Sequence, residues 1–533
     1  MAEVWSESKE VSAREQRILR LCKKRPLYRF LRLHRHLIFD EEIVSELHAM
    51  YARAGKGRPP EDPVRLALAM VMQVAFDEAD SEVPALTAAD LRWRMVLGLL
   101  DAPEHPAFSQ GSVFNFRQRA NEHDFAKRLL NKTVDVARRA KGFSHKRLRA
   151  VIDSSPLLGA GRVEDTINLI GRAIGQVVQV AAAESGRKTD ELADELALTV
   201  VSASSVKAAL DVDWRKPEAR NEALNTLIEQ FRRLQLWLAQ QFTDDERDSP
   251  PLSESIGTVL RLIEQDTEPD PTNDRHRRNR QNEKSDRKRD RQISLSDPDM
   301  RNGRKSRTKL FAGYKRHVAG DADIPGLVVE VALLAANVRE HEGAVPLLDG
   351  LEAGGWTLTE LHNDRGYLPA EAIHERRLAG LKVVSKPPTP ARREGRFSKA
   401  DFTIDVAAGS VTCPEGRTVS ISNGKQRAGY FRRSTCRACP KMGKCLPKSG
   451  QRQVVLHKYE DFHQEQAAEL STKEGRAARR ERVIVEHALA HLGAIQGRRA
   501  RFKGRDKNHF DLQRAAAVNN LYVIDRLHRA EAA

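Results

Sequence analysis

Three acidic residues stand where the sequence pattern suggests that they could share metal ions. Asp153 closes the apolar run AVID, and Asp364 closes the strand-like run TLTELHND. Glu486 lies in the apolar helical stretch VIVEHALAHL. Carboxylates from rigid elements can hold two Mg²⁺ ions about 4 Å apart, an arrangement commonly used for phosphodiester chemistry on DNA. We therefore predict that Asp153, Asp364 and Glu486 form a two-magnesium site.

Each acid also has an ordinary interpretation. Asp153 could be a turn or cap residue, and Glu486 could form a structural pair with Arg482, which lies four residues earlier on the same helical face. An unpaired buried carboxylate is costly, so an acid inside an apolar stretch needs a partner or a function. Three acids in matching places on one fold favour the catalytic interpretation. Glu481 is the alternative third acid, although it points to a different face of the helix.

The elements around these acids follow the order β, β, β, α, β, α, β once a long helical segment is set aside. The segments are RLRAVIDSS, LFAGYKRHVAG, LVVEVALLAANV, a helix over 340–351, TLTELHNDRGY, a helix at PAEAIHERRLAG, and LKVVSKP. A meander continued by β–α units predicts an α/β fold with a mixed, ribonuclease H-like sheet flanked by helices. In that order the first and fourth strands are neighbours, so Asp153 and Asp364 should come together.

Residues 1–145 are expected to form an all-helical domain. Its helix-start signals are Pro63, Thr87, and Ser109 or Ser112. The last of these helices carries Arg117 and Arg119, and short helices ending in a basic one suit a helix-turn-helix-like DNA reader. A plain helical domain with a solvated charged face is the equally weighted alternative.

The remaining chain divides by composition. We expect the catalytic core over 146–158, 296–390 and 455–530, a helical insertion and basic arm over 159–295, and a cysteine-rich insertion over 391–454. The arm, DRHRRNRQNEKSDRKRDRQ, is either a solvated tether or a contact to the DNA backbone.

Four of the five cysteines fall in the last of these segments. Cys413, Cys436, Cys439 and Cys445 have the spacing C-x22-C-x2-C-x5-C, whereas Cys22 stands alone. Four thiolates at such intervals suit a tetrahedral structural Zn²⁺ ion. Four reduced cysteines without metal are the alternative.

The net charge of +16 implies a polyanionic partner. Nucleic acid is the commonest one, and the rival, an anionic membrane, would require an amphipathic anchor or a lipidation motif that the sequence lacks. No apolar run is long enough for a membrane span, and the acidic N-terminus is not a signal peptide. We therefore expect a cytoplasmic, nucleoid-associated protein without a membrane partner.

Several long blocks resemble the bacterial insertion-sequence transposases of the IS1182 family, within the wider IS4-like DDE group. The blocks are DPVRLALAMVMQVAF, DLRWRMVLGL, SVFNFRQR, SSPLLGAGRVEDTINLI, DPDMRNGRKSRTKLFAGYKRHVAGD, NDRGYLP and RVIVEHALAHLGAIQGRRARFKGRDKN. They follow one another in order over most of the chain. The resemblance implies a ribonuclease H-like core, dependence on Mg²⁺, binding to terminal inverted repeats, and donor cleavage followed by strand transfer into target DNA.

The resemblance also assigns residues. The family's acids fall on Asp153, Asp364 and Glu486, and Arg482 fits the arginine expected four residues before the glutamate. The IS4-like signature has a tyrosine and a lysine where this chain has Arg479 and Gly493. The basic residues expected to contact DNA are Arg117, Arg119, Arg304, Lys305, Lys315, Arg316, Arg482, Lys503, Arg505 and Lys507.

Two element ends must be held together for transposition, so a homodimer on double-stranded DNA is expected. Two other functions compete with an active transposase. One is a DNA-binding regulator that keeps the fold without catalysis, which the missing tyrosine and lysine would suit. The other is a metal-dependent nuclease that cuts DNA without joining it.

Overall fold

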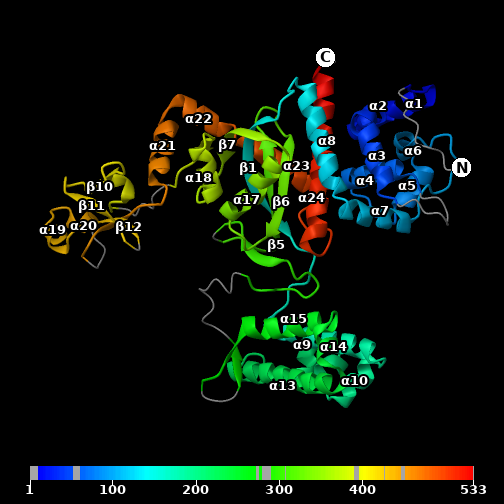
Figure 1. The fold of residues 1–533 in the computed structure, drawn as a ribbon, viewed down its shortest axis with the longest axis horizontal. Helices are drawn as coiled ribbons and strands as arrows, with labels where there is room; N and C mark the ends of the chain where they lie inside the picture. The colour runs from blue at the N-terminus through cyan, green and yellow to red at the C-terminus, as the bar shows by residue number, and fades with distance from the viewer. Residues whose placement is uncertain are drawn as a thin grey trace.

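A mixed sheet lies at the centre of the molecule, with the other regions arranged around it (Figure 1). The computed structural model describes residues 10–51, 61–271, 275–278, 290–306, 308–388, 395–424, 426–445 and 450–531. The N-terminal helices lie on the side of the C-terminal helix, and the cysteine-rich region projects from the opposite side. A bundle formed by the helical insertion lies apart from the sheet, below it in this view. Within the described ranges, no helix has the length and apolar character needed to cross a bilayer.

The central sheet has six strands in the described part of the chain. They are β1 (Arg147–Leu158), β4 (Arg301–Arg304), β5 (Leu310–Asp321), β6 (Val328–Ala335), β7 (Thr357–Asn363) and β8 (Lys382–Ser385). The order is β4-β5-β1-β7-β8, and β6 also pairs with β5. β1, β7 and β8 are parallel, whereas β5 is antiparallel to β1, β4 and β6. The predicted mixed sheet is therefore present, and β4 is an addition that the pattern did not predict.

β1 extends further than the prediction had it. Asp153 does not end the strand, which continues to Leu158 while pairing with β5 alone. The apolar run ends at Asp153 because only the first half of β1 is enclosed by strands on both sides. Ala150, Val151 and Ile152 are fully buried there, as expected for a central strand of a covered sheet.

Helices cover the sheet and form one continuous core with it. They are α8 (Phe125–Ala140), α17 (Ala344–Ala353), α18 (Glu371–Leu378), α23 (Val483–Gln496) and α24 (Arg505–Glu531). α24 packs along α8 and β6, and α23 packs on β1 and β5. The predicted helix over 340–351 begins as a 3-10 turn, η3 (Glu340–Gly343), and continues as α17. A second 3-10 turn, η4 (Arg365–Tyr367), follows β7.

The N-terminal region is helical, as expected. Its other elements are α1 (Ala13–Leu21), η1 (Cys22–Lys24), α2 (Pro26–Ile38), α3 (Glu41–Ala49), α4 (Pro63–Phe76), α5 (Val83–Ala89), α6 (Leu91–Leu97) and α7 (Gln110–Glu122). Pro63 is the first residue of α4, and Ser109 caps α7. Thr87 is not an N-cap: it lies buried inside α5, and the side chain of Asp90 caps α6 instead. The hydrophobic core of these helices is continuous with that of the sheet.

The insertion between β1 and β4 is helical, as predicted, and has its own hydrophobic core. Its elements are α9 (Thr166–Glu184), α10 (Thr189–Glu195), α11 (Thr199–Ser202), α12 (Val206–Leu210), α13 (Pro217–Gln241), α14 (Asp244–Asp248), α15 (Leu252–Asp266), β2 (Thr267–Pro269) and β3 (His276–Arg278). The chain enters and leaves side by side, because the Glu164 amide donates to the Ile293 carbonyl at 3.0 Å. Most of the predicted basic arm, residues 279–289, lies outside the described residues.

The cysteine-rich region forms a small antiparallel sheet that the sequence pattern did not predict. Its elements are η5 (Lys399–Asp401), β9 (Thr403–Asp405), β10 (Ser410–Thr412), β11 (Thr418–Asn423), β12 (Arg427–Tyr430), α19 (Arg433–Arg437), α20 (Met442–Cys445) and β13 (Gln453–Val455). The strands follow the order β13-β12-β11-β10-β9. Two helices, α21 (Glu460–Ser471) and α22 (Lys473–Arg480), lead back to α23.

Candidate active site

The parallel pairing of β1 with β7 brings Asp153 and Asp364 to one edge of the central sheet. Val151 is the partner of His362, so continuing the register by two residues sets Asp153 beside Asp364. Neither acid is within the paired part of this ladder, which leaves both side chains at the rim. The structure therefore brings together the two acids that the strand order predicted as neighbours.

Arg482 connects the third predicted acid to this edge. Its guanidinium donates to Asp153 Oδ2 at 3.1 Å and to Glu486 Oε1 at 2.7 Å. Glu486 is not enclosed by its apolar stretch, because its side chain is 50% exposed. The argument that Glu486 requires a partner because it is buried is therefore wrong. The contact with Arg482 instead points Glu486 toward the sheet edge from the first turn of α23.

Asp153 is the most perturbed acid of the group. Burial raises the pKa of Asp153 to about 6, and the nearby Asp364 and Glu340 carboxylates add to the rise. The Ser154 amide, which donates to Oδ1 at 2.7 Å, and the charge of Arg482 act in the opposite direction. Burial and neighbouring negative charge both disfavour the charged form of a carboxylate, so they act on Asp153 in the same direction.

Glu340 is a fourth acid at this edge, and our sequence analysis missed it. The Ser154 hydroxyl donates to Glu340 Oε1 at 3.2 Å. η4 runs so close to this carboxylate that a Cβ at Gly366 would overlap it. β6 runs parallel to β1, so the loop after β6 begins at the same edge as Asp153 and Asp364. That rule, which we applied to the other two acids, would also have identified Glu340.

The acids approach this edge from both faces of the sheet. Successive side chains of a strand point to opposite faces, so Asp153 and Ser154 diverge. Arg482 and Glu486 contact the Asp153 side, whereas Glu340 contacts the Ser154 side. The Asp153 and Asp364 pair is thus flanked by a glutamate on either face.

Two buried polar side chains lie beneath this edge. Tyr367 Oη and His317 Nδ1 are 2.8 Å apart, and both side chains are fully buried. Burial raises the pKa of Tyr367 well above its ordinary value, and the neighbouring Asp153 and Glu340 carboxylates act in the same direction. Tyr367 therefore keeps its proton and holds the floor of the site as a neutral hydroxyl.

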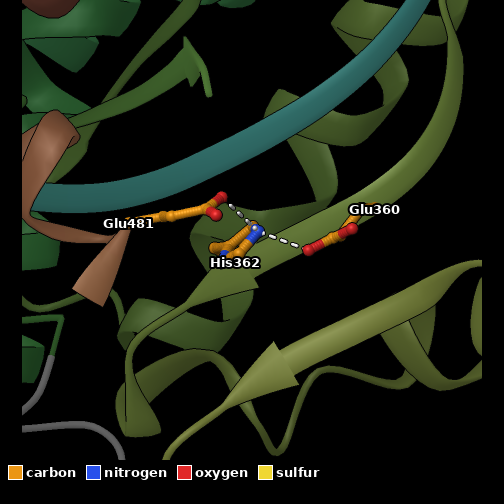
Figure 2. A group of neighbouring side chains, drawn as sticks. All are labelled: Glu360, His362 and Glu481. Atoms are coloured by element: carbon orange, nitrogen blue, oxygen red, sulfur yellow. Dashed lines mark ion pairs between the residues drawn. The ribbon is translucent and has the colours of Figure 1, made fainter. Parts of the chain in front are cut away.

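A second polar group lies deeper in the sheet, where His362 of β7 precedes Asp364 by two residues (Figure 2). Glu360 and His362 project from β7, and Glu481 reaches them from the turn between α22 and α23. His362 Nε2 is 2.7 Å from Glu360 Oε1 and 3.7 Å from Glu481 Oε2. Among the described residues, this is the one group of three or more potential metal ligands whose atoms all lie within 4.8 Å of one another. Glu481, our alternative third acid, belongs here rather than beside Asp153.

Arg149 provides positive charge to this second group. Its guanidinium donates to Glu481 Oε2 at 2.6 Å and to both Glu360 oxygens at 3.4 Å. It also donates to Asp323 at 2.8 Å. Lys382 Nζ lies 3.4 Å from Glu360. Two cations, Arg149 and Lys382, therefore face three carboxylates, those of Glu360, Glu481 and the nearby Asp323.

Some of the basic residues predicted to contact DNA are instead engaged within the protein. Arg316 is buried, and it donates to Pro156 O at 2.9 Å and to Ser155 Oγ at 3.1 Å. Burial lowers the pKa of Arg316 to about 10. Arg117 pairs with Asp80, Arg119 stacks over the Tyr51 ring, and Lys315 donates to the Val338 carbonyl. The contacts of Arg316 with Ser155 and Pro156, together with its burial, leave little of its guanidinium accessible to a phosphate.

The other predicted basic residues are exposed. They are Arg304, Lys305, Lys503, Arg505 and Lys507. The loop before α24 lies against the segment before β4, because Asp297 accepts the Gly504 amide at 3.1 Å and Asp299 accepts the Arg505 amide at 2.9 Å. The loop that carries Lys503 and Arg505 therefore contacts the segment that leads into β4.

The four clustered cysteines line one pocket of about 470 Å³. Zn²⁺ binds thiolates at about 2.3 Å, so four ligand sulfurs lie roughly 4 Å apart in a tetrahedral site. No three of these Sγ atoms lie within 4.8 Å of one another, although all four residues are described. The residue types suit zinc, but the thiols are more widely separated than a bound ion requires.

Comparison with models of known protein families gave two matches. Residues 412–525 match the transposase DDE domain, and residues 19–119 match the transposase domain (DUF772). The first includes the cysteine pocket, Arg482 and Glu486, and the second includes α2–α6 and most of α7. No curated protein and no solved structure gave a match. The two domains, in this order, are typical of IS1182-family transposases, so the resemblance stated from the sequence is confirmed.

Proposed function

We propose that this chain, which carries two transposase domains, is a DDE transposase that binds the terminal inverted repeats of an insertion sequence, cleaves them and transfers the strands to target DNA. The observation that carries the proposal is that Asp153 and Asp364 lie near each other at one edge of the central sheet and that Arg482 links Asp153 to Glu486. These acids come from segments separated by more than a hundred residues, and Arg482 links two of them. The strand order, with Asp153 and Asp364 just beyond the paired part of two adjacent parallel strands, supports a ribonuclease H-like core.

The residues at this edge suit a pair of Mg²⁺ ions. Mg²⁺ prefers carboxylate oxygens and retains several waters, so a few acids at an exposed edge are sufficient. Burial raises the pKa of Asp153, and the Asp364 and Glu340 carboxylates add to the rise. A divalent cation would stabilise the charged form of Asp153. Asp153, Asp364 and Glu486 would hold the ions, which would supply a more acidic nucleophile and stabilise the leaving oxygen.

The chain's own groups would orient the acids. Arg482 holds Asp153 and Glu486 toward each other, and the Ser154 amide fixes one Asp153 oxygen. A hydroxyl nucleophile requires no covalent bond to the protein, so no serine or tyrosine nucleophile is needed. Tyr367, which is buried and hydrogen-bonded to His317, would have a positioning role.

DNA would contact the exposed basic residues at the end of β4 and around the start of α24. We assign phosphate contacts to Arg304, Lys305, Lys503, Arg505 and Lys507, because each lysine or arginine that binds a phosphate releases counterions. The N-terminal helices would bind the element ends, and two chains would hold two ends together. Since the substrate would be chromosomal, the protein would act at the nucleoid in the cytoplasm.

The cysteine pocket would bind a structural Zn²⁺ ion. Its location in the segment before α23 suits a knuckle that contacts DNA or the partner subunit. The four thiols would have to approach one another on binding, which zinc ligands can do because metal binding and local folding are coupled.

The test is Mg²⁺-dependent cleavage and joining of DNA that carries the element's own terminal repeat. Wild type is compared with Asp153→Asn, Asp364→Asn and Glu486→Gln, and DNA binding is measured in parallel. We expect each variant to bind DNA and to lose cleavage and joining. Tight binding by wild type without cleavage would identify a DNA-binding regulator, and cleavage without joining would identify a nuclease. An active Glu486→Gln variant would show that another residue is the third acid.

A further inference from the structure

We propose that Glu360, His362 and Glu481 bind one divalent transition-metal ion, separate from the proposed magnesium pair, that fixes the turn before α23 to strand β7. The binding site itself does not depend on the proposed function. Its consequence for Glu486, five residues after Glu481, does rest on that function.

The spacing of the three ligand atoms suits one ion. Transition metals bind imidazole nitrogen and carboxylate oxygen at about 2.0 to 2.2 Å, so neighbouring ligand atoms lie roughly 3 to 3.5 Å apart. The distances from His362 Nε2 to the two carboxylates, 2.7 and 3.7 Å, lie on either side of that range. Figure 2 shows the imidazole between the two carboxylates, with all three side chains directed toward a common point. Small side-chain rotations would therefore complete the coordination.

The state of His362 points to a ligand. Its side chain is 1% exposed, Nδ1 has no hydrogen-bond partner, and Nε2 faces the Glu360 and Glu481 carboxylates at 2.7 and 3.7 Å. A buried polar group without a hydrogen bond is costly. Imidazole nitrogen is also the commonest metal ligand among side chains.

Arg149 is not the missing partner of His362. It approaches Glu481 Oε2 and both Glu360 oxygens, but it makes no hydrogen bond to His362. Against Arg149 and Lys382 stand Glu360, Glu481 and Asp323, so one negative charge remains when the ring is neutral. Arg149 then serves as the partner that orients the carboxylates, as groups around metal ligands commonly do.

The ligand set indicates which ion would bind. One imidazole and two carboxylates suit Mn²⁺, Co²⁺ or Zn²⁺, whereas Mg²⁺ prefers oxygen ligands alone. The ion would join β7 to the turn between α22 and α23. Arg482 follows Glu481 directly, so this joint would also set the position of Arg482 and Glu486 at the sheet edge.

The experiment uses the full chain with Asp153→Asn and Asp364→Asn, which removes two of the proposed magnesium ligands. Mn²⁺ is the probe, because its paramagnetism reports nitrogen ligands and thiolates are poor ligands for it. Bound Mn²⁺ is counted by electron paramagnetic resonance, and ¹⁴N coupling is measured by a pulsed experiment. We expect a nitrogen-coupled Mn²⁺ ion at a stoichiometry of one per chain.

His362→Gln should abolish the ¹⁴N coupling, and His374→Gln, at another buried histidine, should leave it intact. Glu481→Gln removes a 37% exposed carboxylate with little loss of packing, and should lower the affinity for Mn²⁺ at least about tenfold. Absence of nitrogen-coupled Mn²⁺, or coupling that survives His362→Gln, would overturn the proposal. The measurement uses no DNA, so its outcome is independent of whether the protein is a transposase.

Discussion

Two groups of acids lie one pleat apart on β1 and β7, and they differ in how their charge is compensated. At the rim, Arg482 pairs with Asp153 and Glu486, and the Asp364 and Glu340 carboxylates lie near Asp153. In the inner group, the carboxylates of Glu360, Glu481 and Asp323 face Arg149 and Lys382. The rim group is thus left with the larger excess of negative charge.

This difference separates acids whose charge the fold largely compensates from acids whose charge it leaves largely uncompensated. Arg149 and Lys382 already pair with the inner carboxylates, so one negative charge remains there for the proposed ion to neutralise. At the rim, burial raises the pKa of Asp153, and the Asp364 and Glu340 carboxylates add to the rise. Perturbed pKa values of this kind are concentrated at functional sites.

The largest expected effect distinguishes the two groups by activity. Asp364→Asn should lower the rate of DNA cleavage at least about a thousandfold, because a lost metal ligand costs several kcal/mol of transition-state stabilisation. Glu360→Gln, four residues earlier in the chain, should lower it by no more than about a hundredfold, as expected for a residue that acts through others. Single-turnover cleavage at saturating Mg²⁺ measures both rates. Equal losses would mean that the two groups form one site.

Glu340 tests how far the rim group extends. Glu340→Gln should lower the rate of cleavage about ten- to a hundredfold and raise the Mg²⁺ concentration needed for half-maximal rate. The physical reason is that Glu340 contributes negative charge beside Asp153 and accepts from Ser154. Glu342→Gln, on the same 3-10 turn, is the matched control. If both variants retain the wild-type rate, Glu340 does not contribute to the site.

The stability of the metal-free protein should depend on Asp153 through pH. The folded-state pKa is about 6, above the ordinary value of 3.8, so the folded protein binds this proton more tightly than the unfolded chain does. This contribution to stability is present at low pH and is lost as the pH rises through 6. At pH 8, Asp153→Asn should therefore raise the free energy of unfolding by about 1 to 3 kcal/mol.

Thermal unfolding in EDTA at pH 4.5 and pH 8 measures this difference. Asp101→Asn, at an acid whose side chain is 99% exposed, should leave the melting temperature unchanged at both pH values. A variant at Asp153 that is destabilised at pH 8 would show that its pairing with Arg482 outweighs the cost of burial.

The smallest expected effect concerns the inner group, in which Arg149 faces Glu360, Glu481 and Asp323. Arg149→Met should lower the free energy of unfolding by about 1 kcal/mol, because Glu360 and Glu481 lose their main cation while remaining partly hydrated. Urea unfolding measures the change. If Mn²⁺ occupies the proposed inner site, adding it should restore part of the lost stability. A variant as stable as wild type would show that the ion pairs of Arg149 contribute nothing measurable.

The order of the strands in the sheet was predictable, because apolar runs and their lengths determine which strands are central. This is why the meeting of Asp153 and Asp364 followed from the strand order. Glu340 was missed because the rule applied to the acids that follow β1 and β7 was not extended to the loop after β6, a strand parallel to β1. The inner group joins β7 to a turn more than a hundred residues later, and no local pattern links Glu360 and His362 with Glu481.

The sequence also did not predict which charged side chains are buried. Arg316 has the appearance of a DNA contact because it lies in a basic stretch, yet it is held by Ser155 and Pro156 inside the fold. The cysteine-rich sheet escaped prediction because its strands have three to six residues, too few to show an alternating pattern. The predicted cap at Thr87 failed because Asp90 supplies a better acceptor three residues later.

The two ends of the helical insertion lie side by side, so the insertion is attached to the sheet at a single junction. Glu164 and Ile293 are bonded through their backbones, and Gln265 and Gln292 exchange two further hydrogen bonds above them. Chain ends so close together can be rejoined by a short linker at little entropic cost. The region can therefore be gained, lost or exchanged as a unit without changing the register of β1 and β5. We expect the same junction to accept a foreign domain in place of the whole insertion.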